Sequence, residues 1–345
     1  MPDLDAHVRR IIRWHFDPAT GSPYWLRRAA TLEFDPVRAI QTAADLARFP
    51  AVADEWRTVE AADLIPRGCS GPFAVWETGG TTGAPRRIVD AAARSNGLTR
   101  VNDLLDQHGF PSGGAWLHLG PTGPHLVGAN VPRLARMRGA LSHTIDMDPR
   151  WVKRLNREGR PDEVRRYIAH LAGQALEVLR SQPVRVVTAT PPLLQALADH
   201  PEASARLAEK VSGVIWFGTS LSDEGLRFLE EELLPGAKVV GWYGNTLMGI
   251  ACQRPRQAGD PYRCIFTPPH DAWVRLVDPA NPAREVAPGE TGQVCISLLN
   301  EELFLPWQLE RDQAVRVPGR APAFSDDLAR VAPIGGGGLR TEGVY

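Results

Sequence analysis

The sequence predicts an α/β fold in which doubly wound sheets carry a smaller β-barrel-like subdomain. Two observations support this. In the middle of the chain, β-branched runs alternate with amphipathic helical segments, the order of βαβ units with a parallel sheet. After about residue 250, short apolar runs are separated by Pro, Gly and Asn, which is typical of antiparallel or barrel-like strands. The 345 residues suffice for one large domain or two ordinary ones.

The first 70 residues predict a helical lead-in that packs on the main body. Breaks at Asp17-Pro18, Ser22-Pro23 and Pro50 divide the segment into short helices. No ligand-binding signature occurs there.

The middle of the chain contains the clearest alternation of helix and strand. Apolar residues between Asp162 and Arg180 recur at the spacing of one helix face. The segments that follow are, in order, a strand in PVRVVTATPP, a helix from about Leu193 to Lys210, a strand in GVIWFGTS, a helix over Asp223 to Leu234 and a strand in KVVGWYGN. Ligands on such sheets bind beyond the carboxyl ends of the strands.

The rest of the chain predicts two further regions. Strands in AWVRLVD and TGQVCISLL indicate a β-rich subdomain over residues 251–330 that caps the sheet. Four consecutive glycines indicate a Gly-rich tail over residues 331–345. The α/β region then covers residues 1–250, with the lead-in at 1–70.

Composition excludes several classes of partner. The 39 basic and 40 acidic side chains nearly cancel, so nucleic acid is not expected and a small molecule is. The four cysteines lie far apart without a C-x-x-C pair, which predicts reduced, buried residues. The N-terminal MPDLDAHVRR lacks the features of a signal peptide, and no apolar run approaches a membrane span. We therefore expect a soluble cytoplasmic protein without a membrane partner.

One glycine-rich stretch predicts an anion site. In WETGGTTGAPRRIV, residues 76–89, glycines allow successive backbone N–H groups to point at one anion, and threonine hydroxyls add donors. The stretch is neither a Walker A motif, because Pro85 and Arg86 stand where Lys and Ser or Thr are needed, nor G-x-G-x-x-G. A solvated turn between two strands is the alternative interpretation.

GGTTGAPRR resembles the phosphate-binding loop of the adenylate-forming superfamily, which includes acyl- and aryl-CoA synthetases, peptide-synthetase adenylation domains and luciferases. Four further stretches resemble motifs of that superfamily in the same order, namely VRVVTATPPLLQALA, IWFGTSLS, WYGNT and PGETGQVCISLLNEELFLPWQLERD. TAADLARFPAVADEWRTVEAADLIPRG resembles the N-terminal segment of phenylacetate-CoA ligase-like members. The L-E-R-D and E-G-V-Y stretches are similar to those of small adenylating proteins of phenazine antibiotic biosynthesis.

The resemblance implies the fold of the large N-terminal domain of an adenylate-forming enzyme. It implies ATP-dependent activation of a carboxylic acid, expected to be aromatic, to an acyl- or aryl-adenylate with release of pyrophosphate in a biosynthetic pathway. ATP and Mg²⁺ are the implied cofactors. The partners are the small-molecule acid and an acyl acceptor or partner protein.

The resemblance also implies roles for individual residues. The residues implied to bind the nucleotide are Thr78, Gly79, Gly80, Thr81, Thr82 and Gly83 at the phosphates, Gly218, Thr219, Ser220 and Tyr243 at the adenine, Gly244, Asn245 and Thr246 beside them, and Asp312 at the ribose. The implied catalytic residues are Thr82, Arg86 and His125, with Arg87 as an alternative to Arg86. Thr82 and Thr246 are implied to contact the metal.

Several of these assignments have alternatives. Asp327, in FSDDLARV, is a rival to Asp312, which could itself cap a loop. His118 and His143 share the substrate-side region with His125, and each histidine could be structural. The arginines could lie at the surface. The candidate pocket side chains could belong to the core; they are Trp116, Trp216, Trp242 and Met248.

Two departures from the superfamily pattern matter. Leu247 stands where the superfamily has a glutamate that helps to bind Mg²⁺. The superfamily also has a C-terminal domain with a catalytic lysine, and because the sequence stops at Tyr345 we expect that domain to be absent here. None of Lys153, Lys210 and Lys238 lies in a motif, so we expect that this chain does not supply the catalytic lysine. The expected adenylation is therefore slow or dependent on a partner. The alternatives are a non-catalytic subunit that binds a nucleotide or acyl-adenylate, and a structural or interaction protein.

Overall fold

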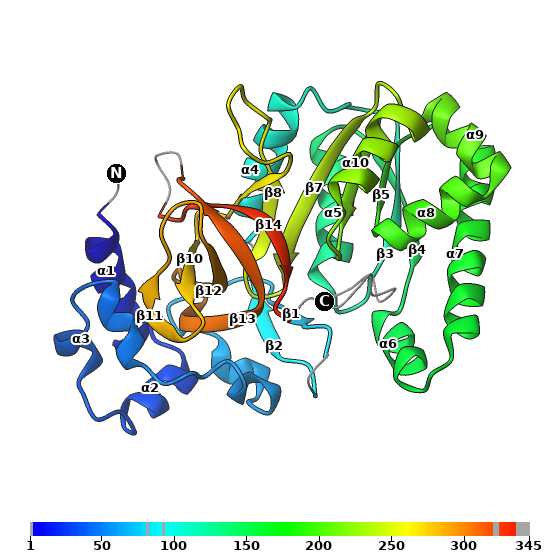
Figure 1. Cartoon of the computed structure of the whole chain (residues 1–345). Helices are drawn as coiled ribbons and strands as arrows, with labels where there is room; N and C mark the ends of the chain where they lie inside the picture. Colours follow the sequence, from blue (N-terminus) through cyan, green and yellow to red (C-terminus); the bar gives the residue numbers. More distant parts are fainter. Residues whose placement is uncertain (1–2, 81–82, 92–93, 320–323, 336–345) are drawn as a thin grey trace.

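The protein is described by a computed structural model covering residues 3–80, 83–91, 94–319 and 324–335. Its main element is a mixed sheet of twelve strands in the described chain, in the order β11-β10-β12-β13-β14-β9-β8-β7-β6-β5-β3-β4 (Figure 1). A separate antiparallel hairpin joins β1 (Ala74–Glu77) to β2 (Arg87–Asp90). The mixed α/β fold predicted from the sequence is confirmed.

One half of the large sheet is parallel and covered by helices on both faces. Its strands are β3 (Ala115–Gly120), β4 (Leu141–Asp146), β5 (Val184–Ala189), β6 (Gly213–Phe217) and β7 (Lys238–Asn245). Neighbouring side chains on one strand point to opposite faces. Val186 accordingly packs with the layer of α4 (Arg94–Gln107) and α5 (Leu126–Met137), and Val187 with the layer of α7 (Pro161–Ser181). The sheet is therefore doubly wound here.

The predicted helices are present, with one correction. The helix expected from Leu193 to Lys210 is two helices, α8 (Pro191–Asp199) and α9 (Pro201–Lys210). Between them His200 has an extended backbone, because the ring of a following proline disfavours the helical conformation. Farther along, α10 (Asp223–Arg227) continues into the π-helical turn η4 (Phe228–Leu233).

The other half of the sheet is antiparallel and begins with the β7–β8 hairpin. Its strands are β8 (Gly249–Gln253), β9 (Ile265–Thr267), β10 (Ala272–Asp278), β11 (Asn281–Glu285), β12 (Thr291–Leu299), β13 (Phe304–Val317) and β14 (Asp327–Pro333). The antiparallel pairing was predicted, but a separate barrel-like subdomain is not confirmed, because these strands extend the same sheet. The Gly-rich tail expected from residue 331 begins later, since β14 reaches Pro333, and residues 336–345 lie outside the described residues.

The N-terminal helices pack on the antiparallel half. They are α1 (Leu4–Phe16), α2 (Pro23–Ala29) and α3 (Pro36–Ala39), with the 3₁₀ turns η1 (Ala44–Arg48), η2 (Glu55–Arg57) and η3 (Ala61–Leu64). The remaining helix of the described chain, α6, spans Pro149–Arg157 and follows β4. The Trp25 indole donates a 3.0 Å hydrogen bond to the Phe304 carbonyl oxygen, and the two rings lie 4.9 Å apart. This contact joins residues 279 positions apart in the chain. In the described ranges, no helix has the length and apolar character that crossing a membrane requires.

Candidate functional site

The predicted phosphate loop connects the strands of the β1–β2 hairpin. The Thr78 N–H donates to the Arg86 carbonyl oxygen (3.1 Å), and the Arg86 N–H donates back to the Thr78 hydroxyl (3.0 Å), so the base of the loop is closed. Gly80 and Gly83 have φ values of 62° and 141°, which only glycine adopts at low cost. Thr81 and Thr82 lie outside the described residues. The glycine spacing is therefore required by the backbone of the turn.

The arginines of the loop are held in ion pairs. Arg86 lies 2.8 Å from Asp54, and its guanidinium lowers the pKa of that carboxyl through a hydrogen bond. Arg87 lies 3.5 Å from Glu77. To bind a phosphate, the Arg86 guanidinium must therefore either contact the phosphate and Asp54 at the same time or break its ion pair with Asp54.

A cavity of about 300 Å³, called here the large cavity, lies at the carboxyl ends of β6 and β7. Its lining includes five residues predicted to bind the nucleotide, Gly218, Thr219, Ser220, Tyr243 and Gly244. Turns after parallel strands are where ligands bind to such sheets.

The lining of the large cavity also contains two groups that sequence reasoning missed. The Arg330 guanidinium lies 5.2 Å from the centre of the Tyr262 ring, and both residues line the cavity. Arg330 has a φ of 49°, unusual for a residue other than glycine. Such strain occurs preferentially at ligand sites, although no sequence pattern announces it.

Tyr243 and Asp312 meet across the sheet. The Tyr243 hydroxyl donates a 3.1 Å hydrogen bond to Asp312 Oδ2, and Oδ1 has no hydrogen-bond partner among the described residues. Asp312 is 6% exposed, and burial raises its pKa although the bond from Tyr243 lowers it. Asp312 is not among the residues that line the large cavity, but its hydrogen-bond partner Tyr243 is. A buried carboxylate oxygen without a donor is suited to receive one from a ligand.

An irregular stretch of β13 places Asp312. Gln293 pairs with Gln313 and Cys295 with Leu309, so four steps along β13 oppose two along β12. Bulges of this kind redirect side chains next to functional sites. The sequence pattern predicted a strand here but could not reveal the bulge.

The same bulge contains a second carboxyl group that the sequence analysis missed. Glu310 has one oxygen without a hydrogen-bond partner in the described chain, and burial raises its pKa to about 7. The charge of Arg86 lowers this pKa and that of Asp312 raises it, so the carboxyl group lies within electrostatic reach of both. Glu310 therefore interacts electrostatically with one residue of the phosphate loop and with the predicted ribose residue.

A smaller cavity of about 90 Å³ adjoins the large one and shares Gly218, Trp242, Tyr243 and Gly244 with it. His125, Asn245 and Thr246 line it. Burial, followed by the charges of Arg150 and Lys153, lowers the pKa of His125, so the imidazole is neutral at pH 7. His125 thus lines a cavity, and its substrate-side role stays a prediction.

The side chains of Asn245 and Thr246 also have local roles. Asn245 Oδ1 accepts a 2.8 Å hydrogen bond from the Met248 N–H, and the Thr246 hydroxyl donates a 3.3 Å bond to the Glu77 carbonyl oxygen. The second bond ties the end of β7 to the phosphate hairpin. These residues therefore shape the smaller cavity and hold the loop beside it.

Two rival residues are engaged elsewhere. Buried Asp327 forms a 3.0 Å ion pair with Arg254, which also binds Asp260 at 2.7 Å. His118 is fully buried with Nδ1 2.7 Å from the Thr188 hydroxyl, and burial lowers its pKa to about 4. These contacts favour structural roles for both. His143, on β4, is not among the lining residues of either cavity.

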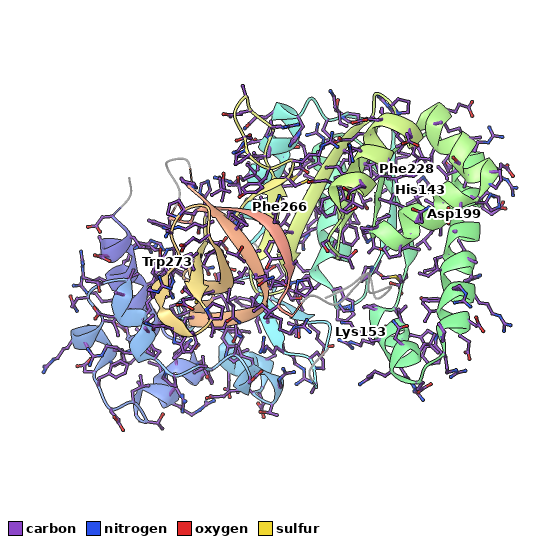
Figure 2. All side chains as sticks on the ribbon, in the orientation of Figure 1. His143, Lys153, Asp199, Phe228, Phe266 and Trp273 are labelled. Carbon is purple, nitrogen blue, oxygen red and sulfur yellow. The ribbon has the colours of Figure 1, made fainter. Side chains whose placement is uncertain are left out.

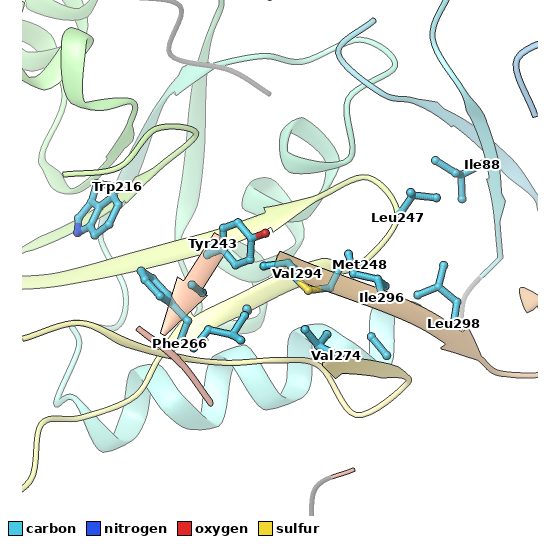
Figure 3. Close-up of a cluster of buried hydrophobic side chains, with 14 of the residues drawn as sticks. Ile88, Trp216, Tyr243, Leu247, Met248, Phe266, Val274, Val294, Ile296 and Leu298 are labelled. Carbon is cyan, nitrogen blue, oxygen red and sulfur yellow. The ribbon is translucent and has the colours of Figure 1, made fainter. Parts of the chain in front are cut away.

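Position 247, where the superfamily has a glutamate, lies in an apolar environment. Leu247 is 1% exposed and packs with Met248 in the apolar cluster of Figure 3. The nearby Glu77 carboxylate is bound by Arg150 and Arg87. Within the described ranges, no group of three His, Cys, Asp or Glu side chains could hold a metal ion.

Helix α6 adds cations that sequence reasoning missed. Arg150 lies 2.5 Å from Glu77, and Lys153 donates a 3.2 Å hydrogen bond to the Gly79 carbonyl oxygen. Figure 2 shows Lys153 where α6 faces the β1–β2 hairpin. The sequence offered one signal for this lysine, which is its place between the apolar residues Val152 and Leu155. All three residues are buried in α6.

Comparisons with known proteins support the fold. Residues 164–299 match the family model of AMP-binding enzymes. A crystal structure of 2-hydroxyisobutyryl-CoA ligase in the postadenylation state has a TM-score of 0.65 at 13% identity, over 94% of this chain and 65% of that one. An open conformation of the same ligase gives 0.64 at 13% identity, over 94% and 67%. The structure of CmiS6 gives 0.50 at 17% identity, over 74% and 59%. No curated protein sequence matches.

These likenesses concern the fold and the central part of the sequence. The chain has the fold of the large N-terminal domain of adenylate-forming enzymes, and its central part matches the AMP-binding enzyme family. It spans 65% of the length of the 2-hydroxyisobutyryl-CoA ligase in the postadenylation state. The narrower resemblance to phenylacetate-CoA ligases and phenazine-pathway proteins is not confirmed.

Proposed function

We propose that this protein binds MgATP and activates a carboxylic acid to an acyl-adenylate. One carboxylate oxygen of the acid attacks the α-phosphorus of ATP, the bond from that phosphorus to the bridging oxygen breaks, and pyrophosphate leaves. Binding the two reactants side by side supplies much of the rate by proximity.

The pairing of Tyr243 with Asp312 carries the proposal. Two residues expected at the adenine and the ribose, 69 positions apart, are joined by a hydrogen bond at the wall of the large cavity. The phosphate loop is tied to the end of the same strand through Thr246. A nucleotide lying along β7 would therefore meet all three features.

The chain's own residues divide the work. Asp312 accepts hydrogen bonds from the ribose, Gly218 to Ser220 border the base, and the backbone N–H groups of residues 78–83 receive the phosphates. Neutral His125 orients the acid from the smaller cavity, because an uncharged imidazole both donates and accepts a hydrogen bond. Thr82, Arg86 and Thr246 add donors at the phosphates.

The lining of the smaller cavity bears on the kind of acid. The cavity has a volume of about 90 Å³ and adjoins the large cavity. Phe217, Trp242 and Ile250 give it an apolar wall. We propose a compact acid with a single aromatic ring or a short branched chain.

Further features of the proposal rest on the resemblance in sequence. The activity belongs to a cytoplasmic biosynthetic pathway, and the adenylate is passed to an amine, a thiol or a reductase of a partner protein. Residues 1–250 bind the nucleotide and the acid, and residues 251–330 close the site with Asp312.

Pyrophosphate release from MgATP, measured with a panel of aromatic and short branched acids, tests the proposal. We expect release that depends on one compact acid and falls sharply in Asp312→Asn. Asp327→Asn is the matched control and retains release per folded molecule. Release independent of any acid, or equal in Asp312→Asn, would contradict the mechanism.

A nucleotide- or adenylate-binding subunit without catalysis is the second candidate. The buried Leu247 favours it, since the described site lacks a carboxylate for the metal at that position. ATP binding without pyrophosphate release in the same panel is the result that selects this candidate.

A further inference from the structure

The buried face of helix α5 contains an asparagine. Leu126, Asn130 and Leu134 follow one another at intervals of four residues, so they lie along the same side of the helix. All three are buried, and Asn130 is 7% exposed. Its side-chain amide makes no hydrogen bond to any residue that the structure describes. Because burying an unpaired amide is costly, this polar residue in an apolar stripe needs a physical explanation.

Asn130 lies where two cavities meet. It lines the smaller cavity, and it also lines a third cavity, of about 30 Å³. The described residues that line both are Leu126, Asn130, Gly249 and Ile250, so Asn130 supplies the polar side chain at the junction. A volume of about 10–15 Å³ is enough for one water, so the third cavity has room for a group the size of a hydroxyl.

Two other polar side chains of the smaller cavity already have partners. Asn245 Oδ1 accepts the Met248 N–H at 2.8 Å, and the Tyr243 hydroxyl donates to Asp312 at 3.1 Å. These bonds shape the wall of the cavity. The Asn130 amide, without such a bond in the described chain, is suited to pair with a bound molecule.

The helix also sets the distance between Asn130 and the residue proposed to orient the acid. His125 is the N-cap residue of α5 and precedes Asn130 by five positions, which corresponds to about 7.5 Å along a helix axis. Both residues line the smaller cavity. An acid whose carboxylate lies at His125 would therefore extend its far end toward Asn130.

The chemistry of the amide indicates which substituent it would recognise. An asparagine side chain both donates and accepts hydrogen bonds, and a hydroxyl group does the same. A methyl group of similar size would leave the amide unpaired. The third cavity is mostly apolar, with Leu98 and Met248 in its lining, and its Asp271 carboxylate accepts a 3.4 Å hydrogen bond from Asn300.

We propose that Asn130 is a specificity-determining residue, and that the acid activated by this protein carries a hydroxyl group at the end distant from its carboxylate. The hydroxyl enters the junction of the smaller and third cavities and exchanges hydrogen bonds with the Asn130 amide. This inference rests on the proposed function, because it assigns a substituent to the acid that the smaller cavity would receive.

The test measures pyrophosphate release from MgATP with pairs of acids in which a methyl group replaces the hydroxyl. The pairs are 3-hydroxybenzoic and 3-methylbenzoic acid, 4-hydroxybenzoic and 4-methylbenzoic acid, and 3-hydroxy-2-methylpropanoic and 2-methylbutanoic acid. Size is nearly constant within a pair, so a preference reports hydrogen bonding. We expect the wild type to have a kcat/KM at least about tenfold higher for the hydroxyl member of one pair.

The variant Asn130→Leu keeps the approximate shape of the side chain and removes its hydrogen bonds. It should lose the preference for the hydroxyl member or reverse it. Asn156→Leu is the matched control: Asn156 is also a helical asparagine, on α6, and its amide nitrogen is buried without a partner in the described chain. Asn156 is not among the described lining residues of the three cavities, so this variant should keep the wild-type preference.

The outcomes separate this inference from the proposed function. A wild type that releases pyrophosphate with these acids but prefers the hydroxyl member of no pair overturns the role of Asn130, and this measurement does not depend on folding of a variant. An unchanged preference in Asn130→Leu, shown to be folded by thermal denaturation, also overturns it. In both cases acid-dependent release leaves the proposed function standing. Wild-type release that depends on no acid overturns the proposed function, and this inference with it.

Discussion

Replacing Asp312 by asparagine gives a sharp test of the site because the structure predicts opposite effects on binding and stability. The substitution keeps the shape and one acceptor oxygen, so the Tyr243 hydroxyl can still donate. It removes the negative charge and one acceptor that the ribose hydroxyls would use. A hydrogen bond to a charged group contributes about 1.5–3 kcal/mol. We therefore expect ATP affinity to fall about 10- to 150-fold.

Stability should move the other way. Burial raises the pKa of Asp312 in the folded protein, so near pH 7 the ionised carboxylate is less favourable in the folded state than in the unfolded state. Asparagine removes this cost. Thermal denaturation of Asp312→Asn should therefore show a melting temperature equal to or higher than that of the wild type.

Asp327→Asn is the matched control for this prediction. It weakens the buried 3.0 Å pair with Arg254 and should cost about 1–3 kcal/mol of stability while leaving ATP affinity within about twofold. Calorimetric titration with ATP and thermal denaturation of all three proteins provide both measurements. Wild-type ATP affinity in Asp312→Asn, or a selective loss of affinity in Asp327→Asn, would refute the assignment of the ribose site to Asp312.

Two further predictions concern stability. The pKa of Glu310 is about 7 in the folded protein and about 4.5 in the unfolded chain. The unfolded chain therefore loses this proton at lower pH, and the free energy of unfolding of the wild type should fall by up to about 3 kcal/mol as the pH rises from 4.5 to 7. Denaturation of Glu310→Gln over this pH range should show no such fall in stability. Identical pH profiles for this variant and the wild type would contradict the prediction. Gly244→Ala should destabilise the β7–β8 hairpin, because the added Cβ would lie 2.0 Å from the Gly249 carbonyl oxygen. Gly173→Ala is the comparison, because a Cβ added at this position of α7 would meet open space. It should raise the free energy of unfolding by about 1 kcal/mol. A melting temperature of Gly173→Ala as low as that of Gly244→Ala would contradict the prediction.

Local pattern predicted the elements that depend on neighbouring residues. Helix α7 and strands β5, β6 and β7 follow from apolar periodicity and β-branched runs, because side-chain direction repeats with the backbone of each element. The break between α8 and α9 was also present in the sequence as Pro201, although the prediction joined the two helices.

The sequence by itself determined a glycine-rich turn that only glycine backbones can form and the order of the candidate motifs around an α/β core. The tertiary structure decided which groups meet. It joined Tyr243 to Asp312, placed Lys153 at Gly79 and paired Asp327 with Arg254. Such pairs lie many residues apart and depend on strand order, a bulge in β13 and the docking of α6. Periodicity specifies which face of an element is apolar, but the partner of that face is chosen only when the whole chain packs.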